Sequence, residues 1–171
     1  DGDGNVWVAD TENNRVLRYD SGFGNGATAS IVLGQPTLSS NGINTEGLSD
    51  KSLNSPRGLA IDGAGNLWVT DSGNNRVLRF SEGGGFSTNQ PADLVLGQPD
   101  FTSNSANNDG ISSDTLSSPQ GITIDDSSNV WVADSGNNRV LKFNTPFTAT
   151  GEAADLVIGQ SVFDSFSSAF T

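Results

Sequence analysis

Carboxylates dominate the residues of this sequence that could do chemistry, and they recur at a fixed spacing from arginines. The chain has no His, Cys or Met, so the commonest general base, the commonest zinc ligand and a thiol nucleophile are absent. Three Asp–Arg pairs share one separation: Asp10 and Arg15, Asp71 and Arg76, and Asp134 and Arg139. An enzyme site needs an asymmetric set of residues, whereas these pairs recur in every copy of a repeat. We therefore interpret them as structural ion pairs, which suit the bidentate geometry of Arg, and predict no catalytic residue.

A second candidate is a metal site at the start of the chain. The sequence Asp1-Gly2-Asp3-Gly4-Asn5 resembles the front half of a calcium loop, in which alternating oxygen ligands suit a hard cation. The matching segments of the later copies, 62–66 and 125–129, have the composition of plain turns. We therefore predict no cofactor and no stoichiometric metal, and leave weak calcium binding by the acidic loops as an open alternative.

These residues belong to a unit of about 62 residues that occurs slightly less than three times. Segments 4–19, 65–80 and 128–143 are near copies, as GNLWVTDSGNNRVLRF in the second. Segments 30–36, 93–99 and 155–161 are also related, as DLVLGQP in the second. Each unit predicts four short strands, which in the second copy are Leu59–Asp62, Asn66–Asp71, Arg76–Phe80 and Asp93–Gly97.

Two further residues recur with the Asp–Arg pairs. A Trp occupies the same place in the second strand of each unit, and we interpret it as packing between units rather than as a sugar-stacking platform. The second Asn of each Asn-Asn-Arg triplet is predicted to form the turn before the third strand. These residues are Trp7, Trp68 and Trp131, and Asn14, Asn75 and Asn138.

The motifs P-x-G-[IL]-x-[IV]-D, G-N-[LV]-W-V-x-D and N-N-R-V-L-[RK]-F together resemble the NHL repeat family. The resemblance implies an all-β fold, a β-propeller with blades of four antiparallel strands, of which this chain holds about three and is incomplete as a monomer. It implies no single activity, since relatives include RNA-binding, protein-docking and sensor domains and a peptide-amidating lyase. The zinc site of that lyase uses His, which this chain lacks.

The expected organisation is a single NHL-type segment over residues 1–171. It comprises a partial blade at 1–36, blades at 56–99 and 119–160, and a Phe-rich tail at 161–171. The connections 36–55 and 99–118 are about 20 residues longer than the family's unit requires. They share apolar anchors at Leu53 and Leu116, which predicts ordered loops rather than linkers.

Incomplete propellers expose blade faces and strand edges that favour association. The tail residues Phe163, Phe166 and Phe170 are expected either to pack on the third blade or to contact a neighbouring chain, and we assign them to an interface. The predicted function is a non-enzymatic scaffold that associates with copies of itself into a ring or a filament. The alternatives are a calcium-dependent, lactonase-like hydrolase and a carbohydrate- or peptide-binding module that uses the loop face.

Charge and composition limit the kinds of partner and the location that we expect for this chain. The chain has 8 basic and 20 acidic residues, a net charge of −12, which disfavours nucleic acid as a partner. No apolar run approaches the roughly 18 residues that span a bilayer, so no membrane span is expected. An acidic surface rich in Ser and Asn and free of Cys predicts an extracellular or cell-surface location. The sequence does not begin with Met, which predicts a processed or truncated chain.

Overall fold

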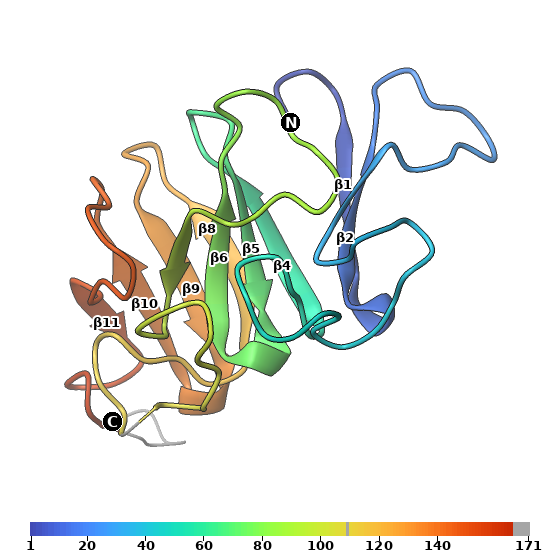
Figure 1. Ribbon diagram of the computed structural model, residues 1–171. Coiled ribbons are helices and arrows are strands. Elements are labelled where there is room, and N and C mark those ends of the chain that lie inside the picture. Colours follow the sequence, from blue (N-terminus) through green and yellow to red (C-terminus); the bar gives the residue numbers. More distant parts are fainter. Residues whose placement is uncertain (109, 166–171) are drawn as a thin grey trace.

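The computed structural model describes residues 1–108 and 110–165 and shows an all-β protein. The strands of these residues form three antiparallel sheets, one for each copy of the repeat, which we call blades one, two and three (Figure 1). Blade one contains β1 (Val6–Asp10), β2 (Arg15–Tyr19) and β3 (Ile31–Leu33). Blade two contains β4 (Pro56–Ile61), β5 (Leu67–Asp71), β6 (Arg76–Phe80) and β7 (Leu94–Leu96). Blade three contains β8 (Pro119–Ile124), β9 (Val130–Asp134), β10 (Arg139–Phe143) and β11 (Leu156–Ile158).

The predicted fold class is confirmed, and blade two shows how closely the strands follow the predicted ranges. Strand β6 has the predicted bounds, and β5 and β7 are slightly shorter than expected. Strand β4 begins at Pro56 rather than Leu59, because Pro56 pairs with Asp71 before a shift in register that precedes the pairing of Leu59 with Val69. The irregularity extends the inner strand toward the turn that carries the Asp–Arg pair.

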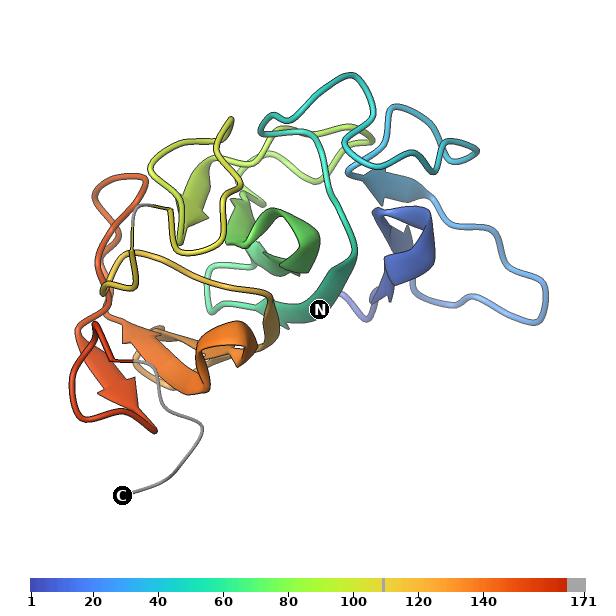
Figure 2. The same ribbon diagram turned by 90° about the horizontal axis from the view of Figure 1, so that it is seen from below.

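The blades follow one another side by side, and their inner strands meet (Figure 2). Strand β8 lies against both β4 and β5, and β4 lies against β1. In each blade the strands pair in chain order, so in blades two and three the fourth strand is the one farthest from the first, inner strand. The contacts nearest the propeller axis are therefore made by the first strands, β4 and β8.

The turn before the third strand has the same build in every blade. A short 3-10 helix, η1 (Thr11–Asn13), η2 (Ser72–Asn74) or η3 (Ser135–Asn137), ends on an asparagine in the left-handed region. These asparagines are Asn14, Asn75 and Asn138, with φ of 52°, 54° and 53°. Asn tolerates this conformation better than most residues, so the turn follows from local sequence.

Each blade has two faces, and adjacent blades pack one face against the other. The Trp face carries the repeated Trp of the second strand, and the Val face carries the residues before and after that Trp. The Trp face of blade one packs on the Val face of blade two, and the core between them includes Val16, Ile31, Leu33, Leu67, Val69, Leu78, Phe80 and Val95. The Trp face of blade two packs on the Val face of blade three through Trp68, Val77, Leu94, Leu96, Val130, Val132, Leu141 and Phe143.

The long connections between blades are ordered and contribute to this core, as their matched anchors predict. Leu53 and Leu116 are fully buried. Leu53 packs against Gly34 and Leu116 packs against Gly97, so closely that neither glycine has room for a side chain. A Cβ built at Gly34 would come within 2.5 Å of the Leu53 side chain. Both glycines have φ of 84°, so the backbone conformation and the close approach of the leucine require the same residue type.

Candidate functional site

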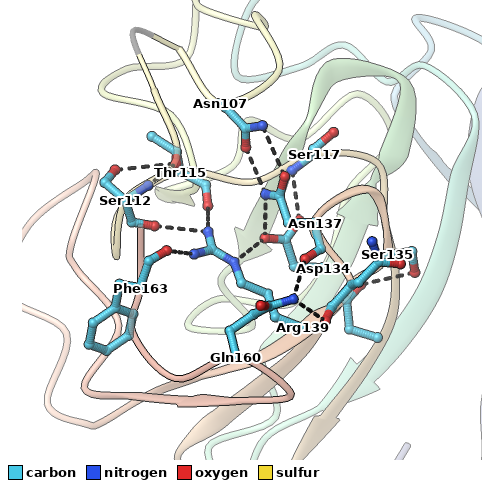
Figure 3. A network of polar contacts seen from close by, with 12 residues as sticks. Asn107, Ser112, Thr115, Ser117, Asp134, Ser135, Asn137, Arg139, Gln160 and Phe163 are labelled. Atoms are coloured by element: carbon cyan, nitrogen blue, oxygen red, sulfur yellow. Dashed lines mark hydrogen bonds and ion pairs between the residues drawn. The ribbon is translucent and has the colours of Figure 1, made fainter. Parts of the chain in front are cut away.

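The repeated Asp–Arg pair lies at the centre of a polar network that joins three segments of the chain (Figure 3). In blade three, Arg139 Nε donates to Asp134 Oδ2 at 2.7 Å. Its Nη2 donates to the carbonyl oxygens of Ser112 and Thr115, both at 2.8 Å, in the loop that precedes the blade. Its Nη1 donates to the carbonyl oxygen of Phe163, in the segment that follows β11. One guanidinium thus binds a carboxylate and the backbone of two loops.

Blade two repeats this network. Arg76 Nε lies 2.7 Å from Asp71 Oδ2, Nη2 donates to Ser49 O and Ser52 O, and Nη1 donates to Phe101 O. The side chains of both ion pairs, in blades two and three, are completely buried. Burial raises the pKa of Asp71 and of Asp134, against the hydrogen bonds and the arginine charge that favour the carboxylate. In both blades the guanidinium donors thus hold two loops against the carboxylate.

A pair of asparagine amides adds a second tie in each of these blades. Asn44 and Asn74 exchange two side-chain hydrogen bonds of 3.0 and 2.8 Å, and Asn107 and Asn137 exchange two of 2.9 and 2.7 Å. Asn44 and Asn107 belong to the long connections, whereas their partners belong to η2 and η3. In the sequence, Asn44 and Asn107 have the same separation as Leu53 and Leu116, but this recurrence does not indicate which residues they contact.

Blade one has only part of the network. Arg15 Nε donates to Asp10 Oδ2 at 2.7 Å and Nη1 donates to Leu38 O. Among the described residues no acceptor lies at Arg15 Nη2. Asp10 Oδ1 accepts a hydrogen bond from Asn13 Nδ2, whereas the equivalent oxygens of Asp71 and Asp134 accept one from a backbone N–H. The Arg15 and Asp10 side chains are 18% and 24% exposed. In the first blade the ion pair is therefore present, but it is partly exposed and has fewer partners among the described residues.

In each blade, the aspartate at the start of the turn before the strand that carries the repeated Trp accepts hydrogen bonds from that turn and from this Trp. Asp125 Oδ1 accepts from the backbone of Ser127 and Asn129, and Oδ2 accepts from Asn129 Nδ2 and from Trp131 Nε1 at 2.9 Å. Asp1 and Asp62 make the same four bonds. In the calcium-like segment, the Asp1 carboxylate is thus engaged by four donors.

These hydrogen bonds shift the titration of the turn aspartates. Hydrogen bonds from Trp131 and Asn129 hold the pKa of Asp125 far below its usual range. Burial by itself would raise the pKa of Asp62, but hydrogen bonds from Trp68, Asn66 and the backbone lower it on balance. A carboxyl whose pKa is lower in the folded than in the unfolded chain stabilises the fold above the unfolded pKa, about 3.9, and that contribution is lost as the pH falls toward the folded pKa.

We therefore expect Asp125→Asn to lower stability at neutral pH and to reduce the slope of stability against pH below about pH 5. The amide keeps one acceptor but cannot accept the Trp131 indole N–H and the Asn129 amide on its nitrogen. Urea unfolding midpoints at several pH values would measure the effect. Asp126→Asn, a substitution at the exposed neighbour, is the control and should change neither quantity. Parallel pH profiles for Asp125→Asn and the parent would contradict this role.

Each repeated Trp lies against a cation of its own blade, and Trp7 and Trp68 also contact a Phe of the next blade. Trp7 and Phe86 have ring centroids 4.7 Å apart in an edge contact, and Trp68 and Phe147 have centroids 5.0 Å apart. Arg18, Arg79 and Lys142 lie 5.8, 5.6 and 5.4 Å from the rings of Trp7, Trp68 and Trp131. The phenylalanines were missed by the sequence reasoning, although a Phe recurs between the third and fourth strands of every unit.

Two blade faces carry apolar residues without the cover that their counterparts have. On the Val face of blade one, Val6 and Val8 are 42% and 39% exposed, whereas the matching residues of blades two and three are fully buried. On the Trp face of blade three, Leu156 and Ile158 are 41% and 49% exposed, whereas the matching Leu94 and Leu96 of blade two are buried. We call these surfaces the open Val face and the open Trp face.

The structure places one of the three tail phenylalanines. Phe163 is half-buried and packs against the core between blades two and three of its own chain. Phe166 and Phe170 lie outside the described residues, so their predicted interface role remains a prediction. No helix in the described part of the chain is long and apolar enough to cross a membrane.

Comparisons with known proteins agree with this architecture. Residues 53–80 and 116–143 match the NHL repeat. No curated protein matches. Among solved structures, a streptogramin B lyase superposes with a TM-score of 0.52 at 12% identity, over 84% of this chain and 35% of the lyase. Virginiamycin B lyase from Staphylococcus aureus (TM-score 0.48, 16% identity, 82% and 34% covered) and a luciferin-regenerating enzyme (0.44, 19%, 91% and 47%) are similar at a lower level. The chain spans about a third of the length of the streptogramin B lyase.

The prediction that this protein is not an enzyme is contradicted by the similarity to the streptogramin B lyase, which is an enzyme by name. At such low identity the likeness shows the fold and assigns no reaction to this chain. The repetition of the Asp–Arg pairs was nevertheless the wrong ground for excluding catalysis, because a propeller can carry its functional residues on loops that differ from blade to blade. The matched repeats and the sheet topology lead to one conclusion: the chain carries NHL repeats and folds as β-propeller blades.

Proposed function

We propose that this chain is an assembly module that binds protein partners, in the first place its own copies, through the open Val face and the open Trp face. The observation that carries the proposal is the difference in exposure between equivalent residues. Val6, Val8, Leu156 and Ile158 are 39% to 49% exposed, although the same positions are buried at both internal blade interfaces. Full burial of such a side chain is worth about 1.5–3 kcal/mol, so covering these faces is favourable.

The two open faces are different surfaces, so a contact between copies is head-to-tail. Such contacts close into a ring where the rotation between copies allows it, and otherwise they extend into a filament. We also propose an extracellular or cell-surface location, which is supported by the acidic, cysteine-free composition. Each copy carries a net charge of −12, so like-charge repulsion opposes the contact at low ionic strength.

The expected result is a solution mass that rises above 17.7 kDa as the protein concentration increases. Association should strengthen as sodium chloride is raised toward about 1 M, where the Debye length falls to about 3 Å and the repulsion is screened. Sedimentation velocity over a range of concentrations would measure both effects. A folded protein that stays monomeric at every concentration and salt level would refute the proposal.

A matched pair of variants connects association to the open faces. Ile158→Lys places a charge on the open Trp face and should weaken association, whereas Ile43→Lys changes a residue that is 64% exposed on the connection between β3 and β4. Equal behaviour of the two variants would show that general surface hydrophobicity, rather than the blade face, drives association.

A further inference from the structure

One aromatic contact crosses each internal blade interface, and the same two positions make it each time. Phe86 lies in the connection between β6 and β7 of blade two and contacts Trp7 of blade one. Phe147 lies in the corresponding connection of blade three, between β10 and β11, and contacts Trp68 of blade two. The contact thus always runs from the Phe of one blade to the Trp of the blade before it.

Blade one has the same phenylalanine, and among the described residues no blade lies against its Val face. Phe23 lies between β2 and β3, at the position that corresponds to Phe86 one repeat later. Its side chain is 52% exposed, and its ring neighbour is Tyr19, at a centroid distance of 6.4 Å and in a tilted arrangement. Phe23 therefore extends from the open Val face in the place from which its counterparts reach across an interface.

Blade three has the complementary tryptophan. Trp131 is held by the hydrogen bond from its Nε1 to Asp125 and by the Lys142 ammonium 5.4 Å from its ring. The equivalent tryptophans make the same two contacts and also meet a Phe of the next blade. Within residues 1–108 and 110–165, no aromatic ring packs on Trp131, which is half-buried rather than buried as Trp68 is.

We infer that Phe23 of one copy packs on Trp131 of a second copy and is the specific contact of the head-to-tail interface. This inference rests on the proposed self-association and names its contact residues. The occupant of the open Trp face is then blade one of another copy, whose Val6 and Val8 come to lie over Leu156 and Ile158, as Leu67 and Val69 lie over the Trp face of blade one. The two internal interfaces are built from these same positions and show how a Trp face and a Val face fit together.

The contact between copies is expected to be smaller than an internal blade interface. Inner strands β4 and β8 make the contacts closest to the propeller axis, and blade one has no described strand in that place. The interface between copies then depends on the outer strands and on the Phe23 loop. Because a central aromatic residue carries much of the energy of a small interface, truncating either ring should weaken association by at least about tenfold.

A mixing experiment tests the pairing directly. Phe23→Ala alone and Trp131→Ala alone should each run as monomers where the parent chain associates. An equimolar mixture should regain association, because the first variant supplies an intact Trp131 and the second an intact Phe23. The complex should stop at two chains, since its outer ends carry the substituted residues and cannot extend it. Sedimentation velocity and native mass spectrometry would count the chains.

The outcomes separate this inference from the proposed function. If Phe23→Ala still associates with itself, or the mixture stays monomeric while each variant is folded, the Phe23–Trp131 pairing is wrong although self-association stands. If the parent chain never associates, both are wrong. Circular dichroism and the unfolding midpoint report whether Trp131→Ala is folded, and Ile158→Lys replaces it in the mixture if it is not. Ile43→Ala serves as the control that should associate like the parent.

Discussion

Replacing Arg76 with Met is expected to lower the free energy of unfolding by about 3 kcal/mol, because it leaves a buried carboxylate without its counter-charge. Arg76 is fully buried and donates to Asp71 and to three carbonyl oxygens from the two loops that flank the blade. Methionine fills a similar volume but donates nothing, so these acceptors lose their partner. Guanidinium unfolding of the variant and the parent would measure the difference.

Arg15→Met is the matched control in blade one. Its ion pair with Asp10 has the same 2.7 Å separation but is partly exposed, and among the described residues no acceptor lies at its Nη2. Exposed ion pairs contribute about 0–1 kcal/mol, so this variant should lose little. Equal losses from the two variants would mean that the buried network is not what stabilises blade two. Adding Asp71→Asn to Arg76→Met should recover part of the loss, since the unpaired charge is removed.

Replacing Gly97 with Ala is expected to cost about 2–5 kcal/mol, for two reasons that a control can separate. The residue has φ of 84°, a conformation that costs an L-residue about 1–2 kcal/mol. An added Cβ would also lie 2.5 Å from Leu116 Cγ, and Leu116 is fully buried in the core between blades two and three. The leucine would have to move, and the long connection that carries it would move with it.

Gly85→Ala isolates the conformational part of this cost. Gly85 has φ of 85°, but nothing lies within 4 Å of the Cβ that alanine would add. Its loss of stability, from the same unfolding measurement, should therefore be about 1–2 kcal/mol. In the double variant Gly97→Ala with Leu116→Ala, the loss should be smaller than the sum of the single losses, because the truncated leucine makes room. Identical losses at Gly85 and Gly97 would contradict the packing argument.

Local patterns were sufficient to predict the strands, the turns and the number of blades. Strand Arg76–Phe80 has the predicted bounds, and Asn75 forms the turn before it, because alternation and turn chemistry depend on residues a few positions apart. The repetition of the unit led to the propeller architecture, since a sheet with two apolar faces must be covered on both. Even the burial of Leu53 and Leu116 could be predicted from matched positions in two loops of equal length.

Contacts between segments far apart in the chain were decided only by the tertiary structure. The sequence indicated that Arg76 pairs with an aspartate, but not that its other donors reach Ser49, Ser52 and Phe101. It contained Phe86 and Trp7 without any sign that the two rings meet. These contacts depend on how one blade is rotated against the next, which is set by the summed packing of many side chains. Equivalent repeat positions are buried in the middle blade and open at the two outer faces, because their burial depends on contact with an adjacent blade and not on the residue type.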